Sequence, residues 1–189
     1  MNQLTLDYKR NVRKYLVYAL SFIILAAIII IISVASLPKS VESTPTSSSS
    51  IVFTNPVLNA QIIKDYSNTD LQWNATLKQW EAHKAVDFMA EPESNVYAVF
   101  KGTVASITTN ALVGTEIVLN HSNGLQTVYK MLNKETNVKV GDVVETGDQI
   151  GTVSVATGNE ELDGAHLHFE VWKDGSKIDP NSYLNLEGK

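Results

Sequence analysis

The sequence predicts a mostly β fold, an antiparallel β-sheet domain preceded by a single N-terminal transmembrane helix. Two observations predict this organisation. Residues 16–37 form one uncharged run in which 19 of 22 residues are apolar. After residue 50, short runs rich in β-branched and aromatic residues alternate with glycine-containing turns. A chain of 189 residues has room for one domain and an anchor.

Residues 1–15 are expected to be a cytoplasmic N-terminus and residues 16–37 a transmembrane helix. A helix of this length spans about 33 Å, enough to cross a bilayer. A cleavable signal peptide is the alternative, but its apolar region usually runs only about 7 to 15 residues. Four basic residues precede the run and only Lys39 follows closely. The positive-inside rule therefore predicts a single-pass protein of the cell membrane with an extracytoplasmic C-terminal domain.

Residues 38–50 contain six Ser and two Thr, which predicts a flexible linker. Residues 51–80 are expected to be a lead-in segment, either a helix with an apolar stripe or an irregular covering segment. Its Trp73 and Trp80 are expected in the core or in a groove wall rather than on a ligand platform. Residues 81–187 form the predicted β domain. Strands are expected at residues 95–109, 115–121, 125–132, 149–155 and 166–173.

Composition excludes several classes of function. A net charge of −5 with no long basic run argues against nucleic acid as the main partner. The chain has no Cys, which excludes disulfides, thiolate metal sites and cysteine nucleophiles. The chemistry must therefore come from other side chains.

Three of the four histidines lie in two compact motifs. In the second motif, strand alternation places His166, His168 and Glu170 on one face and the apolar residues between them on the other. In the first motif, a continuous strand would separate His83 from Asp87 by about 13 Å, so a loop that turns into a strand is expected there. His121 belongs to neither motif and is expected to be structural.

Two imidazoles and one carboxylate are a typical ligand set for zinc. A catalytic zinc ion usually has three such protein ligands and keeps its fourth position for water. His83, Asp87 and His168 supply this set, and His166 is close enough to act as a base without binding the metal. The alternative is that these histidines sit on the surface or make ordinary core hydrogen bonds.

With these motifs the chain resembles the lysostaphin-type, or LytM-type, zinc metallopeptidases, which cut peptide bonds in peptidoglycan. The resemblance covers roughly residues 81–184 and includes the two histidine motifs, the turn after His121 and the Asp179-Pro180 pair. It implies that His83, Asp87 and His168 bind zinc and that His166 is a catalytic histidine.

One position departs from the family pattern. Active members usually read Tyr-x-His-Leu where this chain has Tyr129, Lys130, Met131 and Leu132. Met131 is therefore expected at the position of the second catalytic histidine. A thioether donates no hydrogen bond, and losing one donor to a developing oxyanion costs about 10² to 10³ in rate.

A narrower resemblance is to the stage II sporulation protein Q group of this family. It implies a docking module that binds a stage III sporulation protein AH-like partner domain across an intermembrane space. Two hypotheses follow, a zinc-loaded docking domain with weak or no hydrolysis, and an active membrane-tethered endopeptidase whose substrate is a peptidoglycan peptide.

Overall fold

The computed structural model describes residues 51–184 of the chain. The predicted cytoplasmic segment, transmembrane helix and linker fall in residues 1–50, outside the described residues, so they stay predictions. Between residues 51 and 184, no helix is long and apolar enough to cross a membrane.

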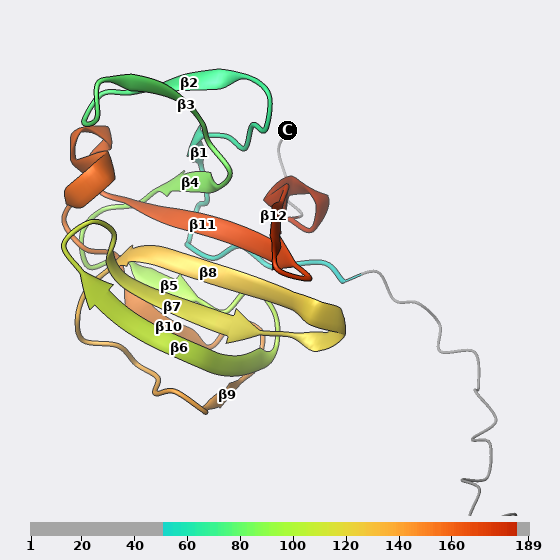
Figure 1. The fold of residues 1–189 in the computed structure, drawn as a ribbon. Helices are drawn as coiled ribbons and strands as arrows, with labels where there is room; N and C mark the ends of the chain where they lie inside the picture. Colours follow the sequence, from blue (N-terminus) through green and yellow to red (C-terminus); the bar gives the residue numbers. More distant parts are fainter. Residues whose placement is uncertain (1–50, 185–189) are drawn as a thin grey trace, which may run out of the picture. The chain divides into compact units, whose positions relative to one another are not determined.

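One large antiparallel sheet forms the body of the described region (Figure 1). Its strands lie side by side in the order β1, β4, β11, β8, β7, β6, β9, and β12 pairs with β11. Their bounds are β1 Ile62–Lys64, β4 Val86–Met89, β6 Gly102–Asn110, β7 Gly114–Asn120, β8 Leu125–Leu132, β9 Val143–Val144, β11 His166–Lys173 and β12 Ser176–Ile178. The mostly β, antiparallel architecture is thus confirmed.

Two smaller sheets and three short 3-10 helices complete the described region. The pairs are β5 with β10, and β2 with β3. The bounds are β2 Leu71–Asn74, β3 Gln79–Ala82, β5 Asn95–Tyr97, β10 Gln149–Thr152, η1 Ser122–Gly124, η2 Gly158–Asp163 and η3 Pro180–Ser182. The predicted strand at residues 95–109 is broken, because β5 pairs with β10 whereas β6 pairs with β7.

Residues 51–80 form neither of the two structures predicted for them, a helix with an apolar stripe or an irregular covering segment. This segment supplies β1 and the β2–β3 hairpin, and its Phe53 and Val57 belong to the hydrophobic core. Trp73 and Trp80 form a cross-strand pair with ring centroids 5.6 Å apart. They remain 47% and 63% exposed, so a core position is wrong for both, whereas a groove-wall position stays a prediction. Alternation in this short hairpin buries Asn74 and turns both indoles outward.

Strand β11 has one face in the hydrophobic core and carries the predicted histidine motif on its other face. Its Leu167, Phe169 and Val171 are fully buried in the main core cluster, as the alternation predicted. Phe169 packs against Tyr129, with ring centroids 5.3 Å apart. The strand is flanked by β4 and β8, so the residues on its other face are held in register from both sides.

Candidate metal centre

The pairing of β4 with β11 brings the three predicted ligands together. His168 and Asp87 are direct cross-strand partners, and His168 Nδ1 lies 2.9 Å from Asp87 Oδ1. His83 lies in the loop that turns into β4, and its Nε2 is 3.2 Å from Asp87 Oδ2. The loop-to-strand geometry expected for this motif is therefore observed.

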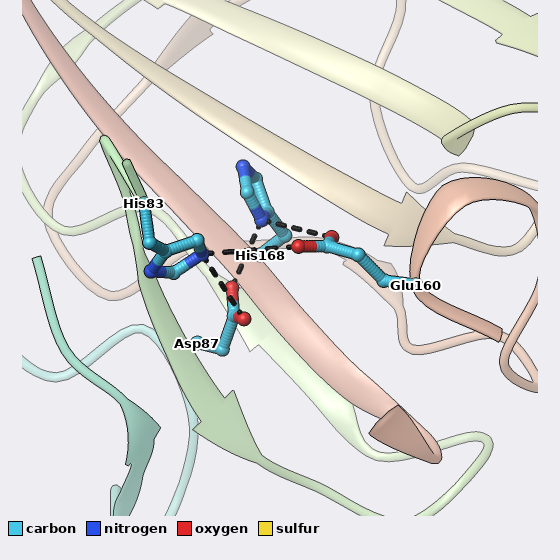
Figure 2. Close-up of side chains that lie close together, drawn as sticks. All are labelled: His83, Asp87, Glu160 and His168. Carbon is cyan, nitrogen blue, oxygen red and sulfur yellow. Dashed lines mark ion pairs between the residues drawn. The ribbon is translucent and has the colours of Figure 1, made fainter. Parts of the chain in front are cut away.

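A fourth side chain, Glu160 from η2, completes this cluster (Figure 2). Its Oε2 lies 3.1 Å from His168 Nδ1 and its Oε1 lies 3.8 Å from His83 Nε2. One ligand atom from each of the four residues lies within 4.8 Å of all the others. No spacing rule selects Glu160 from the sequence, because this residue comes from a turn outside both motifs. Its only signal is an acidic side chain shortly before His166.

The buried polar atoms of this cluster fit a bound cation. Within residues 51–184, the buried side-chain N and O atoms without a hydrogen-bond partner are His83 Nε2, both Asp87 carboxylate oxygens, His166 Nε2 and His168 Nδ1. Asp87 is completely buried. A buried carboxylate without hydrogen bonds is costly unless a positive charge compensates it. Two imidazoles with carboxylates are the N/O ligand set that zinc prefers.

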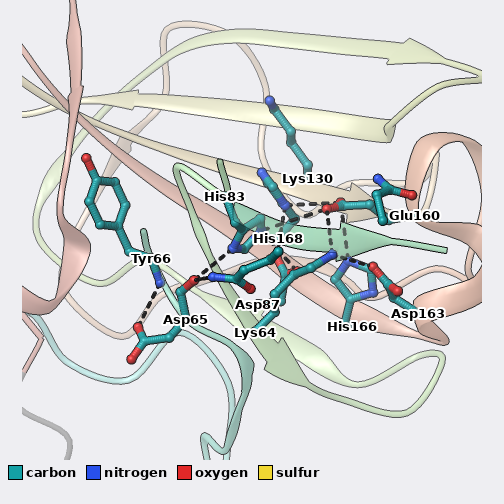
Figure 3. A network of polar contacts seen from close by, with 12 residues as sticks. Lys64, Asp65, Tyr66, His83, Asp87, Lys130, Glu160, Asp163, His166 and His168 are labelled. Atoms are coloured by element: carbon teal, nitrogen blue, oxygen red, sulfur yellow. Dashed lines mark hydrogen bonds and ion pairs between the residues drawn. The ribbon is translucent and has the colours of Figure 1, made fainter. Parts of the chain in front are cut away.

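Outer contacts fix the direction of both imidazoles, and Figure 3 shows the contact between His83 and Asp65. His83 Nδ1 lies 3.1 Å from the carbonyl oxygen of Asp65, and His168 Nε2 lies 3.2 Å from Glu170 Oε1. Metal-binding histidines usually donate their second ring N–H to such a carbonyl or carboxylate. Each ring therefore presents its remaining nitrogen to the cluster.

Charge interactions keep both carboxylates ionised. Burial alone would raise the pKa of Asp87, but the His168 and His83 imidazoles outweigh it and hold this pKa below its usual range. Burial opposes ionisation of Glu160 as well, and His166 with His168 lowers its pKa. Burial lowers the pKa of His168, but Asp87 and Glu160 raise it well above the ordinary value. A metal ion must displace that proton, so metal binding is expected to weaken as pH falls.

His166 lies beside the four-residue cluster. It is completely buried, and its Nδ1 lies 2.7 Å from the carbonyl oxygen of Gly164. Its Nε2 lies 3.5 Å from Glu160 Oε2. This position is compatible with a group that exchanges protons next to the metal, and the catalytic role of His166 stays a prediction.

The backbone is irregular where the family's second catalytic histidine is expected. Met131 is buried and has φ +61°, and the β7–β8 pairing shifts register between Thr115 and Ile117. Such a bulge interrupts strand alternation. Alternation alone therefore does not fix the direction of the Met131 side chain, and its assignment to that position stays a prediction.

The chain matches the model of peptidase family M23 over residues 81–180, more than half of its length. It therefore belongs to peptidase family M23, in agreement with the resemblance to lysostaphin-type peptidases.

Its relatives include stage II sporulation protein Q of Bacillus subtilis (strain 168), 29% identical over 140 residues. That match covers 67% of this chain and 47% of the relative, so the chain spans about half of that protein. A solved structure of the SpoIIQ–SpoIIIAH pore-forming complex matches with a TM-score of 0.63 and 27% identity, covering 72% of this chain and 93% of the matched chain. A zinc-containing peptidase from Vibrio cholerae matches with a TM-score of 0.57 and 26% identity, covering 68% of this chain and 39% of the matched chain.

Proposed function

We propose that the chain is a membrane-anchored, extracytoplasmic M23 domain that binds zinc and docks onto a stage III sporulation protein AH-like partner domain, with weak or no hydrolysis. Zinc would be held by His83, Asp87 and His168. Residues 16–37 would form the anchor, with residues 1–15 in the cytoplasm and residues 38–50 as the linker.

The observation that carries the docking function is the combined likeness in sequence and fold to stage II sporulation protein Q. The sequence match extends beyond the M23 region, because it covers 67% of this chain. The fold match covers 93% of a chain from the SpoIIQ–SpoIIIAH complex. Similarity over nearly a whole matched chain supports a shared mode of assembly.

Two features support weak hydrolysis. The first is Met131, which supplies no hydrogen-bond donor at a position where active members carry histidine. The second is the small groove beside the cluster, which has a volume of about 190 Å³ and is lined by Leu77, Lys130 and His168 among others. Ligand pockets usually measure about 300 to 1,000 Å³.

A binding experiment with the purified full-length chain tests the docking function. The chain, solubilised in mild detergent, is titrated with the extracytoplasmic domain of the AH-like protein from the same organism. Saturable binding is expected, and no binding would refute the docking function. A matched incubation with purified peptidoglycan is expected to release few or no new amino termini.

The second candidate is an active zinc endopeptidase, and the observation that favours it is His166. This imidazole is buried next to the cluster with an unpartnered Nε2, where it could accept or return a proton. The metal ion, when bound, would polarise the carbonyl group of the peptide. Release of amino termini by wild type as fast as by an active M23 peptidase, abolished in His83→Ala, would establish this candidate and refute weak hydrolysis.

A further inference from the structure

We propose that Glu160 is a fourth protein ligand of the metal, so that four side chains enclose the ion and leave no position for water. This inference rests on the proposed zinc set of His83, Asp87 and His168. It changes what that set can do, because three protein ligands with an open position are typical of catalytic zinc, whereas four are typical of structural zinc.

The spacing of the ligand atoms supports four-fold coordination. Zinc–nitrogen and zinc–oxygen bonds of about 2.0 to 2.2 Å in a tetrahedron place neighbouring ligand atoms about 3.3 to 3.6 Å apart. The contacts of Asp87 with the two imidazoles measure 2.9 and 3.2 Å. Those of Glu160 measure 3.1 and 3.8 Å. These four contacts bracket the tetrahedral spacing, and those of Glu160 overlap the range of those of Asp87, although each carboxylate reaches the two imidazoles through different oxygens.

The charge balance supports the same conclusion. With neutral imidazoles, the two carboxylates Asp87 and Glu160 carry a charge of −2, equal and opposite to that of a divalent cation. The Lys64 ammonium lies 4.0 Å from Glu160 Oε1, but its shorter ion pair, at 2.7 Å, is with Asp163. A set without Glu160 would leave a net charge of +1, and that charge helps to acidify a bound water molecule. The side chain of Glu160 is only 10% exposed, so its carboxylate is largely shielded from solvent.

The backbone around Glu160 is held in place by contacts outside the metal cluster. In η2, the Asn159 N–H donates to the carbonyl oxygen of Leu112 at 3.0 Å, and the Leu162 N–H donates to Thr76 Oγ1 at 2.9 Å. The Asn74 side-chain amide donates to the carbonyl oxygen of Asn159 at 3.1 Å. Segment η2 is thus tied to the β6–β7 turn and to the β2–β3 hairpin.

Gly158 fits the close approach at the start of this segment. It has φ +64°, and a Cβ atom there would lie 2.1 Å from the carbonyl oxygen of Leu112. Only glycine satisfies both constraints without a backbone shift. These contacts position the carboxylate of Glu160 before any metal binds, which lowers the entropic cost of using it as a ligand.

The test compares Glu160→Ala with Glu161→Ala in the full-length chain. Glu161 is the adjacent carboxylate and is exposed, so it controls for charge and for changes in η2. Zinc affinity is measured by competition with a chromophoric chelator. We expect at least about a tenfold loss in Glu160→Ala, the lower end of the effect of removing even an outer contact, and no change in Glu161→Ala.

Cobalt substitution reports the open position directly. The visible spectrum of the Co²⁺-loaded chain is recorded with and without azide. We expect azide to leave the wild-type spectrum unchanged and to shift the absorption bands of Glu160→Ala. Azide would bind at the coordination position that the carboxylate no longer occupies. An azide response of equal size in wild type and Glu160→Ala, with equal zinc affinity, would overturn the fourth ligand.

Two further variants separate the possible failures. Glu160→Gln keeps the size of the side chain and replaces Glu160→Ala in the test if the Ala variant does not fold. It should also weaken zinc binding. His83→Ala tests the underlying zinc set. If His83→Ala binds zinc as wild type does, the proposed zinc set is refuted, whereas loss in His83→Ala without loss in either Glu160 variant refutes only the role of Glu160.

Discussion

Two buried carboxylates on neighbouring strands, Asp87 on β4 and Glu170 on β11, differ in the hydrogen-bond donors and cations that surround them. Glu170 accepts from Lys130 at 2.6 Å, from the Trp172 indole N–H at 2.7 Å and from Lys177 at 2.8 Å. Neither oxygen of Asp87 accepts a hydrogen bond from a lysine, an indole or a backbone N–H, and their nearest polar neighbours are His168 Nδ1 at 2.9 Å and His83 Nε2 at 3.2 Å. Two lysine ammonium groups contact Glu170 directly, whereas Asp87 contacts two imidazoles and interacts with the Lys64 ammonium only at longer range. The difference shows which of the two needs an external cation.

The largest effect is expected for Asp87→Asn on zinc binding. An amide oxygen carries no charge and is a poor zinc ligand, so zinc affinity should fall by more than the about 10- to 100-fold typical of an outer contact. Zinc content after dialysis and chelator competition measure this loss. The metal-free stability should change less than in Glu170→Gln, because Glu160 remains beside His168. Equal zinc affinity in Asp87→Asn and wild type would remove Asp87 from the ligand set.

Glu170→Gln should destabilise the protein with or without zinc. It removes the charge that compensates two lysine ammonium groups, and breaking such a buried pair costs about 3 kcal/mol. Lys177 is partly exposed, which reduces this cost. Denaturant unfolding of the metal-free chain measures it, with the exposed Glu91→Gln as control. A loss that appears only in the zinc-loaded protein would show that Glu170 acts solely through His168.

The sequence was sufficient for the parts of the molecule that follow a local rule. Strand alternation correctly separated the core face of β11 from its polar face, and β8 and β11 have the predicted bounds. The four-residue spacing of His83 and Asp87 correctly required a turn into a strand. These outcomes depend on neighbours within one element.

The remaining features depend on contacts between segments distant in sequence. Glu160 reaches the cluster because η2 is hydrogen-bonded to Leu112 and Thr76. No local sequence pattern predicts those hydrogen bonds. The irregular backbone at Met131 arises from an extra residue in the β7–β8 pairing. The exposed Trp73 and Trp80 follow from a hairpin whose polar Asn74 points inward, the reverse of what composition suggests.

Met131→His tests a buried position without a polar group. If the wild-type chain is inert, this substitution should restore some peptidoglycan cleavage in those molecules in which Glu160 leaves the metal, because a missing donor costs about 10² to 10³ in rate. The positive φ of Met131 is compatible with this change, since histidine is enriched in the left-handed region. A greater gain is expected together with Glu160→Ala. Release of amino termini is the measurement, and no gain in either variant with zinc still bound would refute the assigned position.

The smallest effect is expected for His121, a half-buried imidazole whose two nitrogens both have partners. Nδ1 lies 2.8 Å from the carbonyl oxygen of Lys101, and Nε2 lies 2.8 Å from Thr127 Oγ1. Burial lowers the pKa of His121, although the Lys101 carbonyl raises it in part. The unfolded chain therefore binds this proton more tightly than the folded chain, and stability falls as pH drops from about 6.5 through the lower folded-state pKa.

His121→Gln should remove that part of the pH dependence. The difference in unfolding free energy between pH 7.5 and pH 5.5 is expected to shrink by less than about 1 kcal/mol, because the ring is partly exposed to solvent. Metal-free protein is required for this measurement, since zinc binding at the cluster carries its own pH dependence. An unchanged pH profile would mean that His121 keeps its ordinary pKa in the folded state. The hydrogen bond to the Lys101 carbonyl oxygen would then offset the whole effect of burial on the pKa of His121.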